Sequence, residues 1–174
     1  MRRVLDGLYA LSGGLAAAAI CGICLIVAAQ VTLNLVARIG GPGWSLTIPS
    51  YADFSGYLLA AASFLALAHT LRAGAHVRVT LLLRSLPRPA RLACETAALA
   101  LALAASLYGL YYLVALVEES HRFGDRSHGI VSIPLWLPQS VVAAGLGVFC
   151  IALADTLIET LRAGGPVLPD GPGE

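Results

Sequence analysis

Charged residues come in short groups along the chain, separated by four long uncharged stretches. These stretches cover residues 7–37, 54–71, 96–117 and 129–154. A hydrocarbon core about 30 Å thick is crossed by roughly 20 helical residues, because each residue advances the helix by ~1.5 Å. Every stretch reaches or approaches that length. The pattern therefore predicts four membrane-spanning helices, over about residues 8–36, 54–71, 96–117 and 135–154.

The composition agrees with this interpretation. The chain is 58% hydrophobic and 12% charged, and its mean hydropathy is +0.81, whereas about a quarter of the residues in soluble domains are charged. So few charges cannot cover a water-soluble globule, which argues against four buried helices in a soluble core. A net charge of +1 leaves no basic face for phosphates, so we expect no nucleic-acid partner. The first stretch is too long for a cleaved secretory signal and predicts an uncleaved helix.

The segments between the spans complete an all-α membrane fold, which we expect to form one four-helix domain over residues 1–161. Residues 72–90 lie between the second and third spans and mix arginines with leucines and valines. This segment is too short and too charged to cross a membrane, so it predicts a short helix at the interface. Pro87 and Pro89 end it, and Pro89 can open the next helix. Residues 162–174 are rich in glycine and proline, which predicts a flexible cytoplasmic tail.

The arginines predict the orientation. With both termini in the cytoplasm, eight arginines lie inside and three outside, and cytoplasmic loops carry the excess of positive charge. The outside group is Arg38, Arg122 and Arg126; the inside group is Arg2, Arg3, Arg72, Arg78, Arg84, Arg88, Arg91 and Arg162.

Small residues recur four positions apart within the predicted spans, at Ala62 and Ala66, at Ala100 and Ala104, and at Ala143 and Gly147. Such positions let helices approach closely in lipid. They fit packing among the four helices, and they equally fit a partner helix from another protein.

The residues offer little chemistry at membrane depth. Cys21 and Cys24 have redox spacing but lie in mid-span, where we expect ordinary packing. The histidines divide between the two membrane faces, which disfavours haem held by two of them. The cores of the four spans carry no acidic or basic residue, whereas a stand-alone carrier of ions would need one there. We expect neither cofactor, metal site nor catalytic site. A haem or thiol electron-transfer subunit and a self-sufficient small carrier remain the alternatives.

The segment Arg72-Ala-Gly-Ala-His76-Val-Arg78-Val resembles the hallmark stretch of the small membrane subunit of tripartite ATP-independent periplasmic (TRAP) transporters, the DctQ type. Asp53 before the second span, Leu86-Pro87 closing the inner segment and Ile133-Pro134-Leu-Trp136 opening the fourth span agree with it. The resemblance runs from the first helix to about Leu161. Thr80 departs from it, because the family often has an acidic residue there.

The resemblance implies a non-catalytic scaffold in the bacterial inner membrane. Its partners would be a large multi-span subunit that moves a carboxylate solute with sodium, and a periplasmic solute-binding protein that the scaffold helps to dock. Phospholipid would contact the arginines of the inner segment. The expected interface residues are Asp53, Tyr57, Arg72, His76, Arg78, Arg84 and Trp136.

Overall fold

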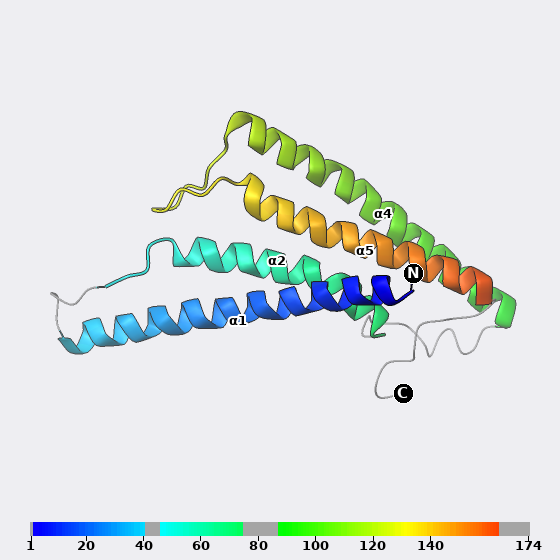
Figure 1. Cartoon of the computed structure of the whole chain (residues 1–174), viewed down its shortest axis with the longest axis horizontal. Coiled ribbons are helices and arrows are strands. Elements are labelled where there is room, and N and C mark those ends of the chain that lie inside the picture. Colours follow the sequence, from blue (N-terminus) through cyan, green and yellow to red (C-terminus); the bar gives the residue numbers. More distant parts are fainter. Residues whose placement is uncertain (1, 41–45, 75–86, 164–174) are drawn as a thin grey trace.

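The computed structural model describes residues 2–40, 46–74 and 87–163. Within them the chain forms four helices: α1 (Arg2–Gly40), α2 (Tyr51–Arg72), α4 (Arg88–Phe123) and α5 (Trp136–Ala163). All four are long and apolar enough to span a membrane. The predicted all-α membrane class is therefore confirmed, and Figure 1 shows the four helices running back and forth.

Local sequence explains where the helices begin and end. Pro87 has an extended backbone and precedes α4, whose first turn contains Pro89; a proline there costs no hydrogen bond, because first-turn N–H groups have no partner in the helix. Gly124 ends α4 in the left-handed conformation, at φ 67°, which glycine adopts without steric cost. Ser50 precedes α2 with a left-handed backbone as well, at φ 58°.

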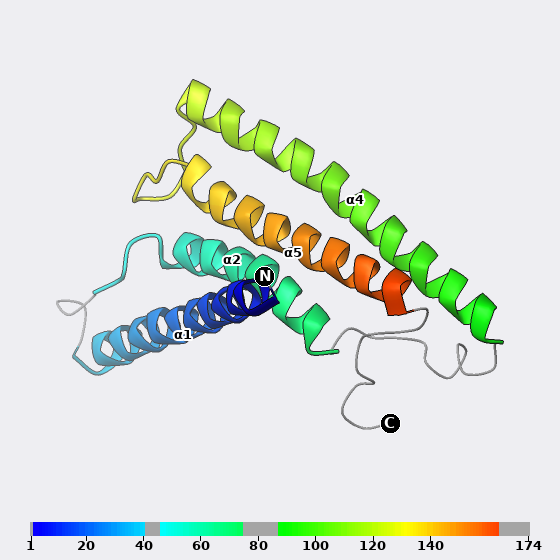
Figure 2. The ribbon, with the colours of Figure 1, turned by 45° about the vertical axis from the view of Figure 1, so that its right-hand side comes forward.

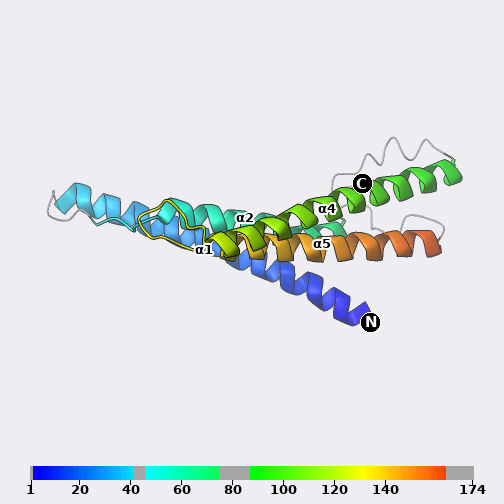
Figure 3. The ribbon, with the colours of Figure 1, turned by 90° about the horizontal axis from the view of Figure 1, so that it is seen from above.

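The helices lie side by side in the order α1, α2, α5, α4. Contacts are extensive between α1 and α2, between α2 and α5, and between α5 and α4. Figures 1 and 2 show the same order from two directions, and Figure 3 shows that the four helices form a thin layer. The fold is therefore an open layer with two edges, α1 and α4, and α5 lies between the two helices that precede it in the sequence.

The best-buried apolar side chains gather near one end of this layer, where α2 and α5 end and α1 begins. Ala68, Leu71, Ala152 and Leu153 are each at most 5% exposed. Ala68 and Ala152 are small, so α2 and α5 can come close together there. The complete cluster is Tyr9, Ala68, Leu71, Leu99, Ala152 and Leu153.

Small residues also set the helix crossings further along. A Cβ atom on Gly145 would lie 2.8 Å from the Phe64 carbonyl carbon, so α5 touches the backbone of α2 at this glycine. Ser12 of α1 donates a hydrogen bond of 2.6 Å to the Leu65 carbonyl oxygen of α2. Ala62 is buried, as the small-residue pattern suggests, whereas Ala100 and Ala104 on α4 are exposed. The last two therefore do not serve packing within this chain.

The helices run beyond the expected spans. α1 has 39 residues and α4 has 36, more than a bilayer requires. α4 already begins at Arg88, so the last residues of the expected interfacial segment 72–90 belong to this helix, and α5 continues to Ala163, two residues into the expected tail. At the other end of that segment Arg72 is the last residue of α2, and residues 75–86 lie outside the described part of the chain.

Candidate interaction sites

The layer has two ends, which we name after one residue each. At the Arg72 end, α1 and α4 begin while α2 and α5 end; at the Ser50 end, the directions are reversed. The charged side chains of the described residues lie at the two ends, because the sequence between the ends contains no Asp, Glu, Lys or Arg in any of the four helices. Polar contacts at the ends and the lipid-facing surface between them are therefore the candidate functional features.

Arg72 is the centre of a polar network at the Arg72 end. Its Nη1 donates a hydrogen bond to Glu159 Oε2 at 2.8 Å, and it lies 3.7 Å from Asp155 Oδ2 and 3.4 Å from Thr156 Oγ1. The Arg72 guanidinium also lies 5.9 Å from the centre of the Tyr9 ring, within cation–π range. The network thus joins α2, which carries Arg72, to α5 and to α1.

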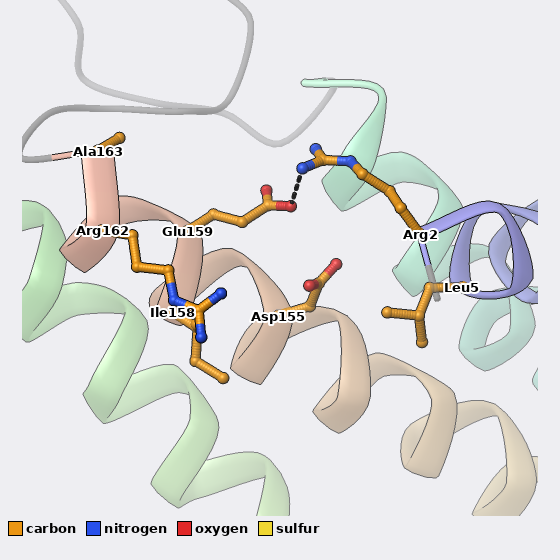
Figure 4. A pocket seen from close by; sticks show the side chains of 7 residues that line it. All are labelled: Arg2, Leu5, Asp155, Ile158, Glu159, Arg162 and Ala163. Carbon is orange, nitrogen blue, oxygen red and sulfur yellow. Dashed lines mark ion pairs between the residues drawn. The ribbon is translucent and has the colours of Figure 1, made fainter.

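Two contacts tie the start of α1 into the same network. Arg2 Nη1 pairs with Glu159 Oε1 at 2.7 Å, as Figure 4 shows. The Tyr9 hydroxyl donates to Asp155 Oδ2 at 3.4 Å, a long hydrogen bond. Glu159 therefore receives one arginine from α1 and one from α2.

The two ion pairs of Glu159 differ in burial, and burial determines how much each contributes to the stability of the helix packing. The side chains of Arg72 and Glu159 are 17% and 14% exposed, while Arg2 is 65% exposed. A charge taken out of water is strongly destabilising without its partner, whereas an exposed pair contributes little. The Arg72–Glu159 pair therefore holds the helices together and Arg2 is an accessory. The guanidinium of Arg72, which we expected at an interface with other molecules, is engaged within its own chain.

An open recess of about 660 Å³ lies beside this network. Figure 4 shows it between the start of α1 and the last turns of α5. Its lining combines two carboxylates with two arginines and apolar side chains, so its charges largely balance. The lining residues are Arg2, Leu5, Asp155, Ile158, Glu159, Arg162 and Ala163.

At the Ser50 end, the loop of residues 124–135 between α4 and α5 folds back on itself. The N–H of Ser127 donates to the Ile133 carbonyl oxygen at 2.9 Å, and the N–H of Leu135 donates to the backbone carbonyl oxygen of Asp125 at 2.9 Å. The Ser127 hydroxyl accepts a hydrogen bond from the N–H of Ile133 at 3.0 Å. These bonds give the loop a defined shape without regular secondary structure.

The tip of this loop rests on the start of α2. The N–H of Val131 donates to Ser50 Oγ at 2.9 Å. Gly129 lies so close that a Cβ atom there would overlap the Asp53 carboxylate and come within 2.5 Å of Ser50 Oγ. Asp53 is half-buried in the first turn of α2, where the helix dipole favours a negative charge. The expected interface residue Asp53 thus also forms part of an internal contact.

The other expected interface residues lie on different helices. Trp136 is the first residue of α5 and is half-buried; its ring meets His121 of α4 edge to face, with centroids 5.4 Å apart. Tyr57 is half-buried on α2, one turn beyond Asp53. Asp53, Tyr57 and Trp136 therefore belong to the Ser50 end and Arg72 to the opposite end. The predicted interface residues His76, Arg78 and Arg84 lie outside the described residues, as does Thr80.

The sulfur and metal-binding side chains remain scattered where the structure describes them. Cys21, Cys24 and Cys94 are exposed free thiols, and Cys150 is buried and free. In the described ranges, no three His, Cys, Asp or Glu side chains come together as they would around a metal ion.

A third surface, absent from the sequence-based expectations, is the outward side of α4. Tyr108, Tyr111 and Tyr112 are 55–70% exposed in the middle part of this helix. Their rings contact one another, with centroids 4.8 Å apart for Tyr108 and Tyr112 and 5.3 Å for Tyr111 and Tyr112. Three tyrosines within a predicted span were a visible signal, because tyrosine normally favours the membrane–water interface.

Taken together, four spanning helices, charged side chains confined to the ends and a broad apolar surface define a multi-pass membrane protein. The family model described as "Tripartite ATP-independent periplasmic transporters, DctQ component" matches residues 23–163. The chain belongs to this family, and it is a small subunit of a TRAP transporter. No curated protein and no solved structure matches it.

Proposed function

We propose that this chain is the non-catalytic scaffold of a sodium-driven uptake system for a carboxylate solute in the bacterial inner membrane. In this system a soluble protein captures the solute in the periplasm and a large membrane subunit carries it inward. The chain braces the large subunit in the bilayer and helps to dock the binding protein. Membership of the DctQ family carries this proposal.

The distribution of charge supports a bracing role. From residue 7 to 37, 54 to 71, 96 to 117 and 136 to 154 the helices contain no Asp, Glu, Lys or Arg. A carrier for an anion places ionisable groups or broken helices at membrane depth to hold its cargo. An uncharged layer suits contact with a neighbouring protein and with lipid, while the cargo site belongs to the large subunit.

The experiment is transport by purified components in liposomes. The large subunit, the binding protein and this chain together should accumulate a radiolabelled carboxylate when a sodium gradient is applied. Omitting this chain should abolish uptake, because the large subunit then lacks its brace. This chain alone should accumulate nothing, since it has no charged group at membrane depth. Uptake by this chain alone, or undiminished uptake without it, would contradict the proposal, as would a haem absorbance band in the purified chain.

The proposed orientation places the Arg72 end in the cytoplasm and the Ser50 end in the periplasm. Arg2, Arg3, Arg72, Arg91 and Arg162 belong to the first end, against Arg38, Arg122 and Arg126 at the second. The folded loop 124–135 then faces the periplasm, where the binding protein arrives. Alkaline phosphatase fused after Glu174 should be inactive, and the same enzyme inserted after Gly124 should be active. The opposite pair of activities would reverse the orientation.

A further inference from the structure

The outward side of α4 carries a regular seam of exposed side chains. Its members follow each other at alternating steps of three and four residues, which is the spacing that helices use to pack along one another. The seam consists of Leu101, Ala104, Tyr108, Tyr111, Ala115 and Glu118, and all of these are exposed.

The seam lies on the side of α4 that faces away from the rest of the chain. The inward side packs on α5, with Leu99 buried and Gly109 close to Leu146. Leu101 lies two residues beyond Leu99, which on an α-helix is a rotation of about 200°. The neighbours of α4 in this chain therefore do not cover the seam.

The tyrosines place hydroxyl groups deep in the lipid. Tyr111 lies seven residues and Tyr108 ten residues from Glu118, the first charged residue beyond the span, so their Cα atoms lie about 10 Å and 15 Å from it. Side chains on a helix lean towards its N-terminus. These rings therefore lean away from the nearer membrane surface, and their hydroxyls do not reach its headgroups.

Hydrocarbon chains offer these hydroxyls no hydrogen-bond acceptor, and an unsatisfied polar group in lipid is costly. Within the described ranges, the Tyr111 hydroxyl forms no hydrogen bond. The rings of Tyr108 and Tyr112 contact each other. Even a hydrogen bond between their two hydroxyls would use one donor and leave the other O–H unpaired. The seam therefore calls for acceptor groups from outside the chain.

The opposite edge of the layer shows what a lipid-facing helix looks like in this protein. Every large apolar side chain exposed on α1 is Leu, Ile or Val, from Val4 to Ile39. The Thr32 hydroxyl there is satisfied by the Ala28 carbonyl oxygen of the same helix. The α1 edge thus suits acyl chains, and the α4 edge differs from it in the chemistry of its exposed side chains.

The shape of the seam admits a helix. A shallow groove of about 430 Å³ runs along it, lined by Leu107, Leu110, Tyr111, Val114, Ala115 and Glu118. Ala104 and Ala115 lie one turn from a tyrosine on either side, and such small residues permit close approach between helices in lipid. The seam therefore offers a groove for a helix and, at the same depth in the membrane, tyrosine hydroxyls that can donate hydrogen bonds to it.

We propose that the α4 seam packs against a transmembrane helix of the large transport subunit, whose carbonyl, hydroxyl or carboxylate oxygens accept hydrogen bonds from the tyrosines. This inference rests on the proposed function, because the large subunit is the partner that the family provides. It adds the face, the depth and the chemistry of the contact. The α1 edge remains turned to lipid.

Photo-crosslinking in membranes that contain both subunits tests the proposal. A photoreactive amino acid replaces Ala104 on the seam or, as the matched control, Ala18, which is exposed on α1. Position 104 should form an adduct that mass spectrometry identifies as this chain joined to the large subunit, and position 18 should not. An adduct between two copies of this chain, lipid adducts alone at position 104, or the large-subunit adduct at position 18 would overturn the proposal.

A second measurement separates shape from hydrogen bonding. Ala104→Trp should lower the amount of large subunit that co-purifies by about tenfold, because an overfilled contact costs that much, whereas Ala18→Trp should leave it unchanged. Tyr111→Phe should lower it about threefold, the usual effect of one hydrogen bond in a membrane. The thermal stability of the isolated chain should be the same as wild type in both seam variants, Ala104→Trp and Tyr111→Phe. Unchanged co-purification of Ala104→Trp would overturn the inference.

Failure of the inference can be told apart from failure of the proposed function. If the wild-type chain neither co-purifies with the large subunit nor supports its transport, the proposed function is wrong. If the wild-type chain does both while the seam variants behave as wild type, the function stands and the contact lies on another face.

Discussion

Different kinds of contact stabilise the two ends of the helical layer. At the Arg72 end, partly buried charges of α2 and α5 meet beside Tyr9 of α1, and the best-buried apolar side chains lie next to them. At the Ser50 end, a folded loop touches the start of α2 through a serine hydroxyl and a close glycine contact. The comparison indicates that the Arg72 end fixes how the helices converge. Among the described residues, the Val131–Ser50 and Ile48–Gln30 hydrogen bonds at the Ser50 end join loops to helices, which suits a surface that another protein approaches.

Removing the positive charge of Arg72 is expected to have the largest effect on the stability of the protein. Arg72→Met keeps the apolar stem but leaves Asp155 without its arginine and Glu159 with only the exposed Arg2. Breaking such a buried pair costs about 3–5 kcal/mol. The free energy of unfolding, measured in mixed micelles by denaturant titration, should fall by that amount.

Two further variants test whether unpaired buried charge causes the loss of stability in Arg72→Met. Arg2→Ala removes an exposed partner of Glu159 and should cost no more than ~1 kcal/mol. Adding Asp155→Asn and Glu159→Gln to Arg72→Met should recover much of the lost stability, because the unpaired charges are then gone. If Arg2→Ala were as damaging as Arg72→Met, the ranking of the two ion pairs by burial would be wrong.

A smaller effect is expected at the Ser50 end. Gly129→Ala puts a methyl group where the Asp53 carboxylate lies, and such overfilling costs about 1–3 kcal/mol when neighbours cannot move away. Because the loop is exposed and can shift, the readout is local: limited proteolysis should cut residues 124–135 faster in the variant.

Relief of the clash provides the control. In the double variant Asp53→Ala with Gly129→Ala, the cleavage rate should return towards that of Asp53→Ala alone, as expected for residues in direct contact. Equal effects of Gly129→Ala with and without the Asp53 carboxylate would show that this carboxylate does not lie against Gly129 as described.

The sequence could predict the four helices because lipid imposes a simple rule. Backbone polar groups must be satisfied within each span, so a long uncharged stretch has to be a helix. The order of the helices could not be predicted in the same way. It depends on contacts such as Gly145 against Phe64, and an alanine- and glycine-rich chain offers many equivalent small-residue positions.

The candidate sites were only partly predictable. Arg72 and Asp53 stood out as charges at span ends, but such groups can be solvated by water, and their partners lie far away in the sequence. One signal was present: Asp155 and Glu159 are four residues apart and so share a face of α5. The tyrosines of α4 were a second signal. The predictions for His76, Arg78 and Arg84 remain predictions, since these residues lie outside the described part of the chain.

The position of α5 has a consequence for how this protein is made. Synthesis proceeds from the N-terminus, so α1, α2 and α4 leave the ribosome before the helix that separates α2 from α4 in the finished layer. Until α5 enters the membrane, α4 lacks its main neighbour and Arg72 lacks both of its carboxylates. The last helix to be synthesised therefore completes the architecture, and a chain truncated before Trp136 would leave a helical hairpin and a solitary helix rather than a smaller version of the layer.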